Sequence, residues 1–134
     1  MIYIRYNEVR YITLRYITLQ HKYKKGGVKM DAHIKKVYVP MTETGFYILL
    51  CLQEPNHGYG IVQKVKELTN DDIVLTPGTM YGSLSKMEKD GLISFEREEQ
   101  KRKIYRITEL GREVLEIEMN RIERLYNNMK EMRL

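Results

Sequence analysis

The clearest chemical signal in this chain is a set of four side chains at helical spacing that are suited to contact phosphates and base edges. They lie between Leu75 and Ile93, in a segment with no acidic residue before Glu88. Hydroxyl groups can donate hydrogen bonds to phosphates or bases, a phenol can contact either, and a lysine can neutralise a phosphate. The candidate contacts are Thr79, Tyr81, Ser83 and Lys86.

The same segment carries the signals of a helix with two marked ends. Thr76 is a predicted N-cap, Pro77 is tolerated in the first turn, and Gly91 predicts a stop just after the last turn. An apolar stripe at i, i+4 and i+7 predicts the buried side, formed by Met80, Leu84 and Met87. The polar residues should then lie on the opposite face, where a positive helix N-terminus without nearby acids suits a DNA groove.

Two alternating segments follow this helix. Residues 92–97 and 104–108 alternate apolar and polar side chains, as half-buried strands do. The charged residues 98–103 between them form a predicted hairpin tip. A helix followed by a hairpin is the order of a winged helix-turn-helix, so basic tip residues would reach the flanking minor groove or the DNA backbone. These residues are Lys101, Arg102 and Lys103.

Two further helices are predicted before this unit. Residues 41–54 and 60–69 place apolar side chains at helical spacing, and residues 55–60 form a turn cluster between them. Tyr59, in that turn, has two interpretations: its ring can pack on the core, or its hydroxyl can contact a phosphate. The predicted fold class is mainly α with a small β-hairpin, a winged helix-turn-helix followed by a C-terminal dimerisation helix.

Four motifs occur at consistent spacing along this region. They are His57-Gly-Tyr-Gly60, Pro77-Gly-Thr-Met-Tyr81, Leu84-x-x-Met-Glu-x-x-Gly-Leu-Ile93 and Lys103-x-Tyr-Arg-Ile-Thr-x-x-Gly-Arg112. With them, residues 42–132 resemble PadR-type bacterial transcriptional regulators, of the short type with a single C-terminal helix. The resemblance implies a homodimeric repressor that binds a double-stranded DNA operator, often in its own promoter. Many members of the family respond to small molecules, so it also implies a small-molecule effector.

Each candidate contact also has an ordinary structural interpretation. A tyrosine on a helix is commonly half-buried core, and lysines on a helix are commonly a solvated face. We favour DNA for Tyr81, Lys86 and the basic tip because the layout supplies a partner. The alternative is a winged-helix module that binds another protein without contacting DNA. Acidic or apolar exposure around the third helix would favour that alternative, whereas steep salt dependence would favour DNA.

The charge of the chain is unevenly distributed. The formal net charge is +5 at pH 7, but residues 1–29 hold seven Lys and Arg against one Glu. Residues 30–134 hold sixteen Lys and Arg against seventeen Asp and Glu, which is near neutral. A DNA-binding charge in this region must therefore be local, at the third helix and the hairpin tip.

A long final helix is predicted over residues 109–132. Leucine, isoleucine and methionine recur at heptad-like spacing there, although Glu118 interrupts the seam. Such an apolar helix must cover something, either its own domain or a partner, and the resemblance favours pairing in a homodimer. The candidate dimer residues are Leu115, Ile122, Leu125, Met129 and Met132. A cleft between two such helices could hold a ligand against Met119 and Tyr126, but methionines at this spacing are more often core.

Other function classes find little support. The chain has one cysteine, Cys51, in an apolar segment, and three scattered histidines, so neither an enzyme nor a metal or cofactor site is predicted. No stretch approaches the roughly 18 apolar residues of a membrane span, and no signal peptide is apparent. We expect a cytoplasmic protein. Its predicted organisation is an extension (1–29), a winged-helix DNA-binding domain (30–108) and a C-terminal dimerisation helix (109–134).

The first 29 residues are expected to be a disordered or non-native extension. The pentapeptide Arg10-Tyr-Ile-Thr-Leu14 repeats at once as residues 15–19, and the segment is basic and rich in tyrosine. One hypothesis is a β-prone arm that binds DNA or another chain. We prefer translated upstream DNA, because residues 25–30 can be encoded with the ribosome-binding sequence AGGAGG ahead of an ATG for Met30. Residues 5–7 can likewise encode a bacterial promoter element.

This hypothesis predicts that translation starts at Met30 and that the repeat is a direct DNA repeat beside the promoter. The genomic codons for residues 25–30 are the measurement. Codons for Gly26 and Gly27 that lack GGAGG would remove the main support for the hypothesis.

Overall fold

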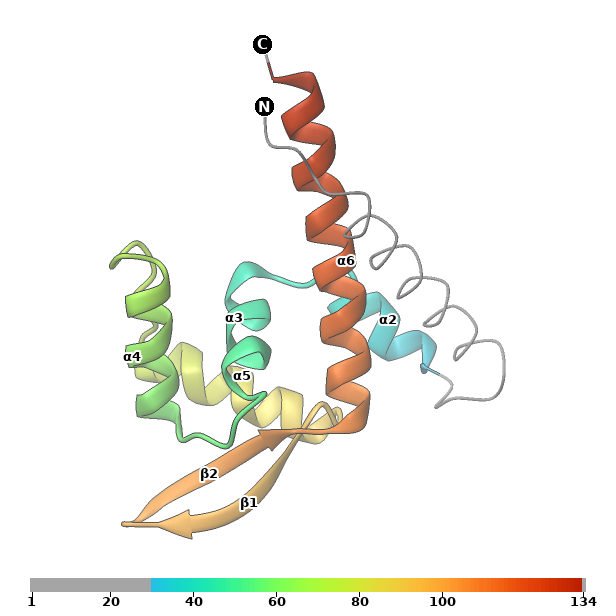
Figure 1. Ribbon diagram of the computed structural model, residues 1–134. Coiled ribbons are helices and arrows are strands. Elements are labelled where there is room, and N and C mark those ends of the chain that lie inside the picture. Colours follow the sequence, from blue (N-terminus) through green and yellow to red (C-terminus); the bar gives the residue numbers. More distant parts are fainter. Residues whose placement is uncertain (1–29, 134) are drawn as a thin grey trace. The chain divides into compact units, whose positions relative to one another are not determined.

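Five helices and one hairpin follow one another in residues 30–133, the part of the chain that the computed structural model describes (Figure 1). Residues 1–29 and 134 lie outside it, so the predictions for the extension and its repeat are not tested by the structure. The elements are α2 (Ala32–Tyr38), α3 (Glu43–Cys51), α4 (Gly58–Leu68), α5 (Pro77–Lys89), β1 (Ile93–Glu99), β2 (Arg102–Ile107) and α6 (Glu109–Met132).

This architecture confirms the predicted fold class of a mainly helical chain with a small hairpin and a long final helix. The differences are local, and one of them is that α4 begins at Gly58 instead of residue 60. Helix α3 ends at Cys51 rather than Glu54, because Leu52 is already its C-cap. Helix α2 was not predicted, since seven residues are too few to establish a helical period.

Side-chain caps fix where four of the helices begin. In each case a side chain just before the helix accepts a hydrogen bond from the backbone N–H three residues later, which satisfies one of the free donors of the first turn. The caps are Thr42 to Gly45 at 3.1 Å, His57 to Gly60 at 2.9 Å, Thr76 to Thr79 at 3.3 Å and Thr108 to Gly111 at 3.1 Å. Thr76 thus caps α5 as predicted, whereas the histidine cap of α4 was not foreseen.

Helix α5 is seated by the apolar stripe that the sequence shows. Met80, Leu84 and Met87 are all buried, and α5 contacts α4 on one side and β1 on the other. Gly91 has φ of +80°, a left-handed conformation that a side chain would strain, so the chain turns sharply after α5. The turn at Gly91 sets the direction in which β1 begins.

The hairpin of β1 and β2, residues 93–107, is called the wing below. Its strands are antiparallel, with Ile93 opposite Ile107 and Glu99 opposite Arg102, and a bulge lies at Glu96. Only Gln100 and Lys101 form the turn, and both have positive φ. The observed strands therefore extend closer to the turn than the predicted ones. Positive φ at both central residues matches the twist of a two-residue hairpin turn.

Backbone hydrogen bonds attach the wing to the first helices. The N–H of Ile107 donates to the carbonyl of Leu52 at 2.9 Å. Asn56 and Tyr105 exchange two backbone hydrogen bonds, of 3.0 and 2.9 Å. The α3–α4 connection therefore forms an isolated antiparallel β-bridge with β2, and the wing is held against the start of α4.

Helix α6 starts in close contact with the wing and then leaves the domain (Figure 1). Gly111 is buried, and a β-carbon there would overlap the carbonyl oxygen of Leu92. Val114 and Leu115 continue this buried contact, whereas the large apolar side chains from Ile122 onward are exposed. The helix thus has a core half and a free half.

A buried carboxylate marks the boundary between these halves. Glu118 is 0% exposed, and its Oε2 accepts hydrogen bonds from the backbone N–H of Met41 at 3.2 Å and from the Arg121 guanidinium at 2.7 Å. A charge can be buried at tolerable cost only when it is paired in this way. The residue that interrupts the predicted dimer seam therefore joins α6 to the segment before α3.

We predict that Glu118→Ala destabilises the protein by about 2–4 kcal/mol, because it leaves a backbone donor and a guanidinium without their shared acceptor. Glu118→Gln should lose less, since an amide oxygen can still accept from Met41. The measurement is denaturant unfolding followed by circular dichroism at one fixed protein concentration. Glu131→Ala, an exposed change on the same helix, is the control. If Glu118→Ala unfolded at the same midpoint denaturant concentration as the control, the role of Glu118 in joining α6 to the segment before α3 would be contradicted.

Candidate nucleic-acid interface

The start of α5 offers free backbone donors and no opposing charge. Thr76 caps the helix, Pro77 occupies its first turn, and that turn contains no acidic residue. Basic residues appear only in the last turn. The positive end of the helix dipole is therefore available to an anion such as a phosphate.

The outward face of α5 is not quite the one expected from the sequence. Thr79 and Tyr81 are exposed, as expected. At 100° per residue, however, the positions directly opposite the buried stripe are Gly78, Gly82 and Lys89, with Ser85 and Lys86 about 50° to either side of them. A β-carbon built at either glycine meets nothing within 4 Å, so this face is flat and open. Ser85 was not among the expected contacts, whereas Lys89, which belongs to the local positive charge expected at the third helix, lies on this outward face.

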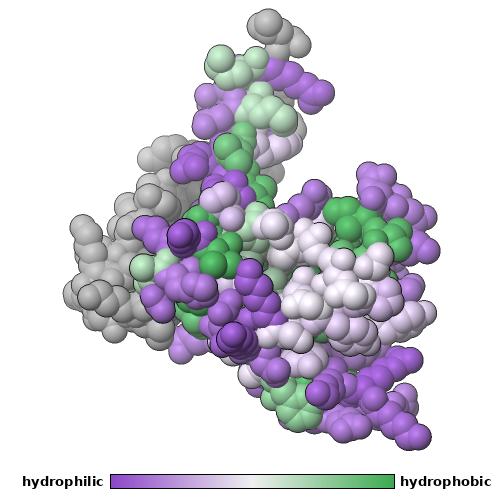
Figure 2. Space-filling model, turned by 180° about the vertical axis from the view of Figure 1, so that it is seen from behind, coloured by the Kyte–Doolittle hydropathy of each residue, from purple (hydrophilic) through white to green (hydrophobic). Residues whose placement is uncertain are grey.

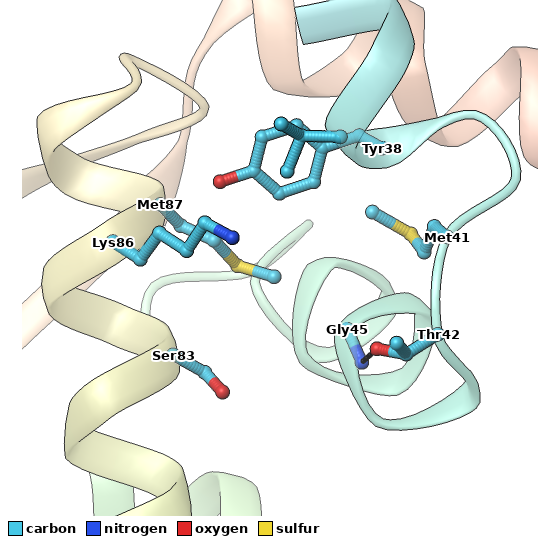
Figure 3. A pocket seen from close by; sticks show the side chains of 8 residues that line it. Tyr38, Met41, Thr42, Gly45, Ser83, Lys86 and Met87 are labelled. Carbon is cyan, nitrogen blue, oxygen red and sulfur yellow. Dashed lines mark hydrogen bonds between the residues drawn. The ribbon is translucent and has the colours of Figure 1, made fainter.

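Two of the expected contacts lie on the flank of α5 instead. Ser83 and Lys86 line a cavity between α5, α2 and the start of α3 (Figure 3). The Lys86 ammonium lies 5.9 Å from the centroid of the Tyr38 ring. In this conformation the Lys86 side chain is directed towards α2, and Lys89 is the lysine on the outward face.

The start of α4, the start of α5 and the wing meet at a cluster of rings and a guanidinium. Tyr59 is 58% exposed, and the guanidinium carbon of Arg102 lies 5.4 Å from its ring centroid. An Nη of Arg102 also lies 3.3 Å from Nε2 of His57, the residue that caps α4. Tyr81 is 60% exposed and its ring lies beside Gly58, where a β-carbon would sit 3.3 Å from it. Tyr59, Tyr81 and Arg102 are therefore brought together, with His57 as an unpredicted member.

All acidic side chains of the wing lie on β1, together with one arginine, whereas the charged side chains of β2 are all basic. The three acids of β1 are Glu96, Glu98 and Glu99, whereas the bases Arg102, Lys103 and Arg106 lie on β2. Arg97 pairs with Glu96 and Glu99, and Arg106 lies 3.6 Å from Glu96. Among the described residues, these pairs partly neutralise β1. The wing as a whole holds five basic and three acidic side chains, a net charge of +2, and its exposed cations Lys101, Arg102 and Lys103 lie at the turn.

The C-terminal end of α5 is fixed to α2. The Tyr38 hydroxyl donates to Asp90 at 2.6 Å, and Nε2 of His33 lies 3.4 Å from the same carboxylate. The hydrogen bond from Tyr38 lowers the pKa of Asp90. Burial and the neighbouring carboxylate raise the pKa of Tyr38, so the phenol stays protonated and remains a donor. A change in the position of α2 would therefore be transmitted to α5.

Exposed apolar side chains gather in two places (Figure 2). Leu68 and Val74 lie at the end of α4 and in the connection to α5, away from the cationic wing tip. The second group lies on the free half of α6 and consists of Ile122, Leu125, Tyr126, Met129 and Met132. Outside these two groups, Phe95 on β1 and the two tyrosines of the cluster described above are also exposed.

The expected dimer residues separate into two groups on α6. Leu115 is only 2% exposed within its own protomer, so the structure removes it from the candidate interface and places it in the core. The other four, from Ile122 to Met132, share one exposed stripe. Of the two expected ligand contacts, Met119 is half-buried and Tyr126 is exposed beneath Lys130, whose ammonium is 5.1 Å from the ring centroid.

Within residues 30–133, no group of three or more His, Cys, Asp or Glu side chains could hold a metal ion. No helix in that range combines the length and apolar character needed to cross a bilayer.

The chain resembles known proteins both in sequence and in structure. Residues 48–117 match the model of the transcriptional regulator PadR-like family, which is more than half of the chain. The transcriptional regulator YqjI of Escherichia coli K12 is 27% identical over 78 residues. These residues are 58% of this chain but 38% of YqjI, so the chain spans well under half of that relative.

Solved structures agree with this assignment. A PadR family transcription regulator from Clostridium difficile R20291 has a TM-score of 0.58 and 27% identity, covering 67% of this chain and 97% of that one. A PadR-like transcription factor from Bacteroides fragilis has a TM-score of 0.56 and 28% identity, covering 66% and 87%. A Clostridium thermocellum regulator, with a TM-score of 0.60 and 22% identity over 78% and 99%, shares the fold. The winged-helix architecture and the family match together show that the chain belongs to the PadR-like family of transcriptional regulators, which are not enzymes.

Proposed function

We propose that this regulator is a repressor that binds a double-stranded DNA operator as a homodimer. One observation carries the proposal. The outward face of α5, the start of α4 and the cationic turn of the wing together present hydroxyl groups, phenol rings and cationic side chains. The helix supplies a flat, polar surface with a bare N-terminus, which suits a major groove. The wing supplies the cations for the flanking backbone or minor groove.

Each side chain has a distinct proposed role. Thr79, Tyr81 and Ser85 face the base edges and nearby phosphates from α5, and Lys89 neutralises a phosphate at its far end. Ser83 and Lys86 contribute only if their side chains turn outward from the flank. From the start of α4 and the wing, the phosphate contacts are Tyr59, Lys101, Arg102 and Lys103. The ring of Tyr59 also supports the guanidinium of Arg102, so packing and DNA contact are compatible for this residue.

The free half of α6 supports the proposed homodimer. A stripe of large apolar side chains at helical spacing is costly to leave in water and is covered when two such helices pair. A two-fold dimer would set two α5 helices about one turn of DNA apart, roughly 34 Å, and would match an inverted repeat. An effector cleft at Met119 and Tyr126 needs that pairing and stays a prediction.

We further propose the boundaries 30–108 for the DNA-binding domain and 109–134 for the dimerisation helix, with residues 1–29 encoded by upstream DNA. The operator then includes the regulator's own promoter.

The DNA interface predicts that Tyr81→Ala and Lys89→Ala weaken operator binding by about tenfold each, and that Lys89→Ala lowers the salt slope by about one because it removes one phosphate contact. The measurement is a mobility shift of the full chain on its own upstream DNA, with a scrambled duplex for comparison. Lys66→Ala is the matched control, because it removes the same charge at the end of α4 remote from Tyr59.

Equal affinities for all three variants would contradict the assignment of α5 as the reading helix. Binding that does not change with salt, or equal binding to both duplexes, would favour the alternative of a protein-binding module. The exposed Leu68 and Val74 are where such a module would contact a protein partner.

The proposed dimer predicts that Leu125→Asp separates the protomers, because an unpaired carboxylate in a dry helix pair costs several kcal/mol. Leu125 is 50% exposed within the protomer, so the change should leave the fold intact. Sedimentation velocity gives the mass. Asn127→Asp adds the same charge to the opposite face of α6 and should remain dimeric. A Leu125→Asp variant with dimer mass would move the interface elsewhere.

A further inference from the structure

His57 caps helix α4 with a larger side chain than capping requires. Its Nδ1 accepts the N–H of Gly60 at 2.9 Å, whereas threonines cap α3, α5 and α6. An imidazole has a second nitrogen that takes no part in the cap. This Nε2 lies 3.3 Å from an Nη of Arg102 on the wing. The chemistry of this contact depends on which ring nitrogen carries the proton.

The cap fixes the position of that proton. A neutral imidazole has one donor and one acceptor nitrogen, so an Nδ1 that accepts from Gly60 leaves the proton on Nε2. The opposite tautomer would set two N–H donors against each other in the first turn of α4 and leave both unsatisfied. The guanidinium of Arg102 has only donors. The contact between His57 and Arg102 is therefore a pair of neighbouring donors and not a hydrogen bond.

The structure holds both donors in place. The rings of His57 and Tyr59 are nearly parallel, with centroids 6.4 Å apart, and the guanidinium carbon of Arg102 lies 5.4 Å from the centroid of the same Tyr59 ring. Asn56 and Tyr105 exchange two backbone hydrogen bonds that join the start of α4 to β2. Two N–H donors kept 3.3 Å apart can both donate to one oxygen atom placed between them.

The surrounding charges favour an anionic oxygen at this point. Glu99 lies opposite Arg102 in the hairpin, but its carboxylate pairs with Arg97 at 3.0 Å. Lys101 and Lys103 flank Arg102 in the sequence and are exposed. A guanidinium beside an outward N–H, with two further cations nearby, matches the oxygens of a phosphate, which accept charge-assisted hydrogen bonds.

We propose that His57 and Arg102 together bind one non-bridging phosphate oxygen of the DNA backbone, His57 through its Nε2–H and Arg102 through an Nη–H. This contact rests on the proposed function, because DNA supplies the phosphate. His57 then serves two elements at once, since Nδ1 holds the start of α4 and Nε2 holds the DNA. Phosphate contacts of this kind fix the position of a protein on the duplex, so this one sets the register of α5 in its groove.

The neutral imidazole gives this contact a distinct signature. The salt dependence of DNA binding counts the phosphate charges that the protein neutralises, with a slope of about 0.9 for each phosphate. Loss of the Arg102 charge should therefore lower the salt slope by about one. Loss of the His57 donor should lower the affinity at every salt concentration and leave the slope unchanged. A histidine that only positioned Arg102 would lower the slope when it is replaced.

The first experiment determines the tautomer of His57 in the full chain without DNA. Side-chain ¹⁵N NMR at mildly alkaline pH distinguishes a protonated from an unprotonated ring nitrogen, and the spectrum of His57→Thr identifies the signals of His57. A proton on Nε2 and none on Nδ1 is expected. A neutral ring with its proton on Nδ1 would overturn the proposed contact.

The second experiment separates the cap from the outward donor. His57→Thr installs the residue that caps three of the other described helices, so α4 should keep its start, which denaturant unfolding checks. Mobility shifts on the upstream DNA at several salt concentrations should show at least fivefold weaker binding with an unchanged slope. Arg102→Ala should bind at least tenfold more weakly with a lower slope. Lys66→Ala is again the control for a lost charge remote from this site.

The third experiment tests whether the two side chains share one phosphate. The His57→Thr, Arg102→Ala double variant should lose less affinity than the product of the two single losses, because both residues contact the same oxygen. Replacing the phosphates of the duplex one at a time by neutral methylphosphonate should reveal one position in each half-site that weakens the wild type but not the double variant. Fully independent losses, or no such position, would overturn the shared contact.

The outcomes distinguish this contact from the function on which it rests. A wild-type chain that binds no DNA would overturn the proposed function, and the contact with it. A wild type that binds its upstream DNA selectively, with a His57→Thr variant of equal affinity, would overturn the contact of His57 alone. A folded His57→Thr variant whose salt slope falls as far as that of Arg102→Ala would also overturn it, because His57 would then act only through Arg102.

Discussion

The buried carboxylate of Glu118 is the constraint on which the arrangement of this domain depends. A carboxylate that is 0% exposed must keep its hydrogen-bond partners, and here these are the N–H of Met41 and the guanidinium of Arg121. Helix α6 therefore cannot slide along the domain by a turn without leaving a charge unpaired. This fixes the length of α6 that belongs to the core and the length that remains free. It also fixes the segment before α3, which forms one wall of the cavity.

Helix α5 is likewise held in place by its neighbours. Its buried stripe holds it from within, Gly91 sets its end, and the Tyr38–Asp90 hydrogen bond ties its last turn to α2. What remains adjustable is the flank that carries Ser83 and Lys86, which borders a cavity rather than packed side chains. A packed core transmits displacement, whereas a cavity absorbs or accepts it. The flank of α5 is therefore the side on which this helix borders open space rather than packed neighbours.

Much of the fold could be predicted because its determinants are local. The cap at Thr76, the stripe Met80–Leu84–Met87 and the stop at Gly91 are all contained within sixteen residues, and the structure confirms each of them. Helix α2 was not predicted, because its seven residues are too few to show a helical period. Leu115 was assigned to the dimer because heptad spacing cannot tell whether an apolar residue faces its own domain or a partner.

The candidate site was harder to predict than the fold, for two physical reasons. The polar residues of α5 point in several directions. The angle measured from the buried stripe separates Lys89 from Ser83, but only the tertiary structure shows that Lys86 is directed towards α2. The cavity depends on tertiary packing, because it joins residues near position 40 to residues near position 85. No pattern in the sequence predicts that these two segments lie next to each other.

The charge distribution of the wing explains how a nearly neutral domain could bind a polyanion. Residues 30–134 carry one more acid than bases, so attraction to DNA cannot come from net charge. In the wing, Arg97 and Arg106 pair with the acids of β1, and the turn presents Lys101 to Lys103 to solvent. At physiological ionic strength a field is screened within about 8 Å, so a phosphate close to the turn would respond to these local cations more than to distant acids. Such a surface favours docking in one orientation and gives little non-specific attraction at long range, because beyond the screening length the domain presents almost no charge.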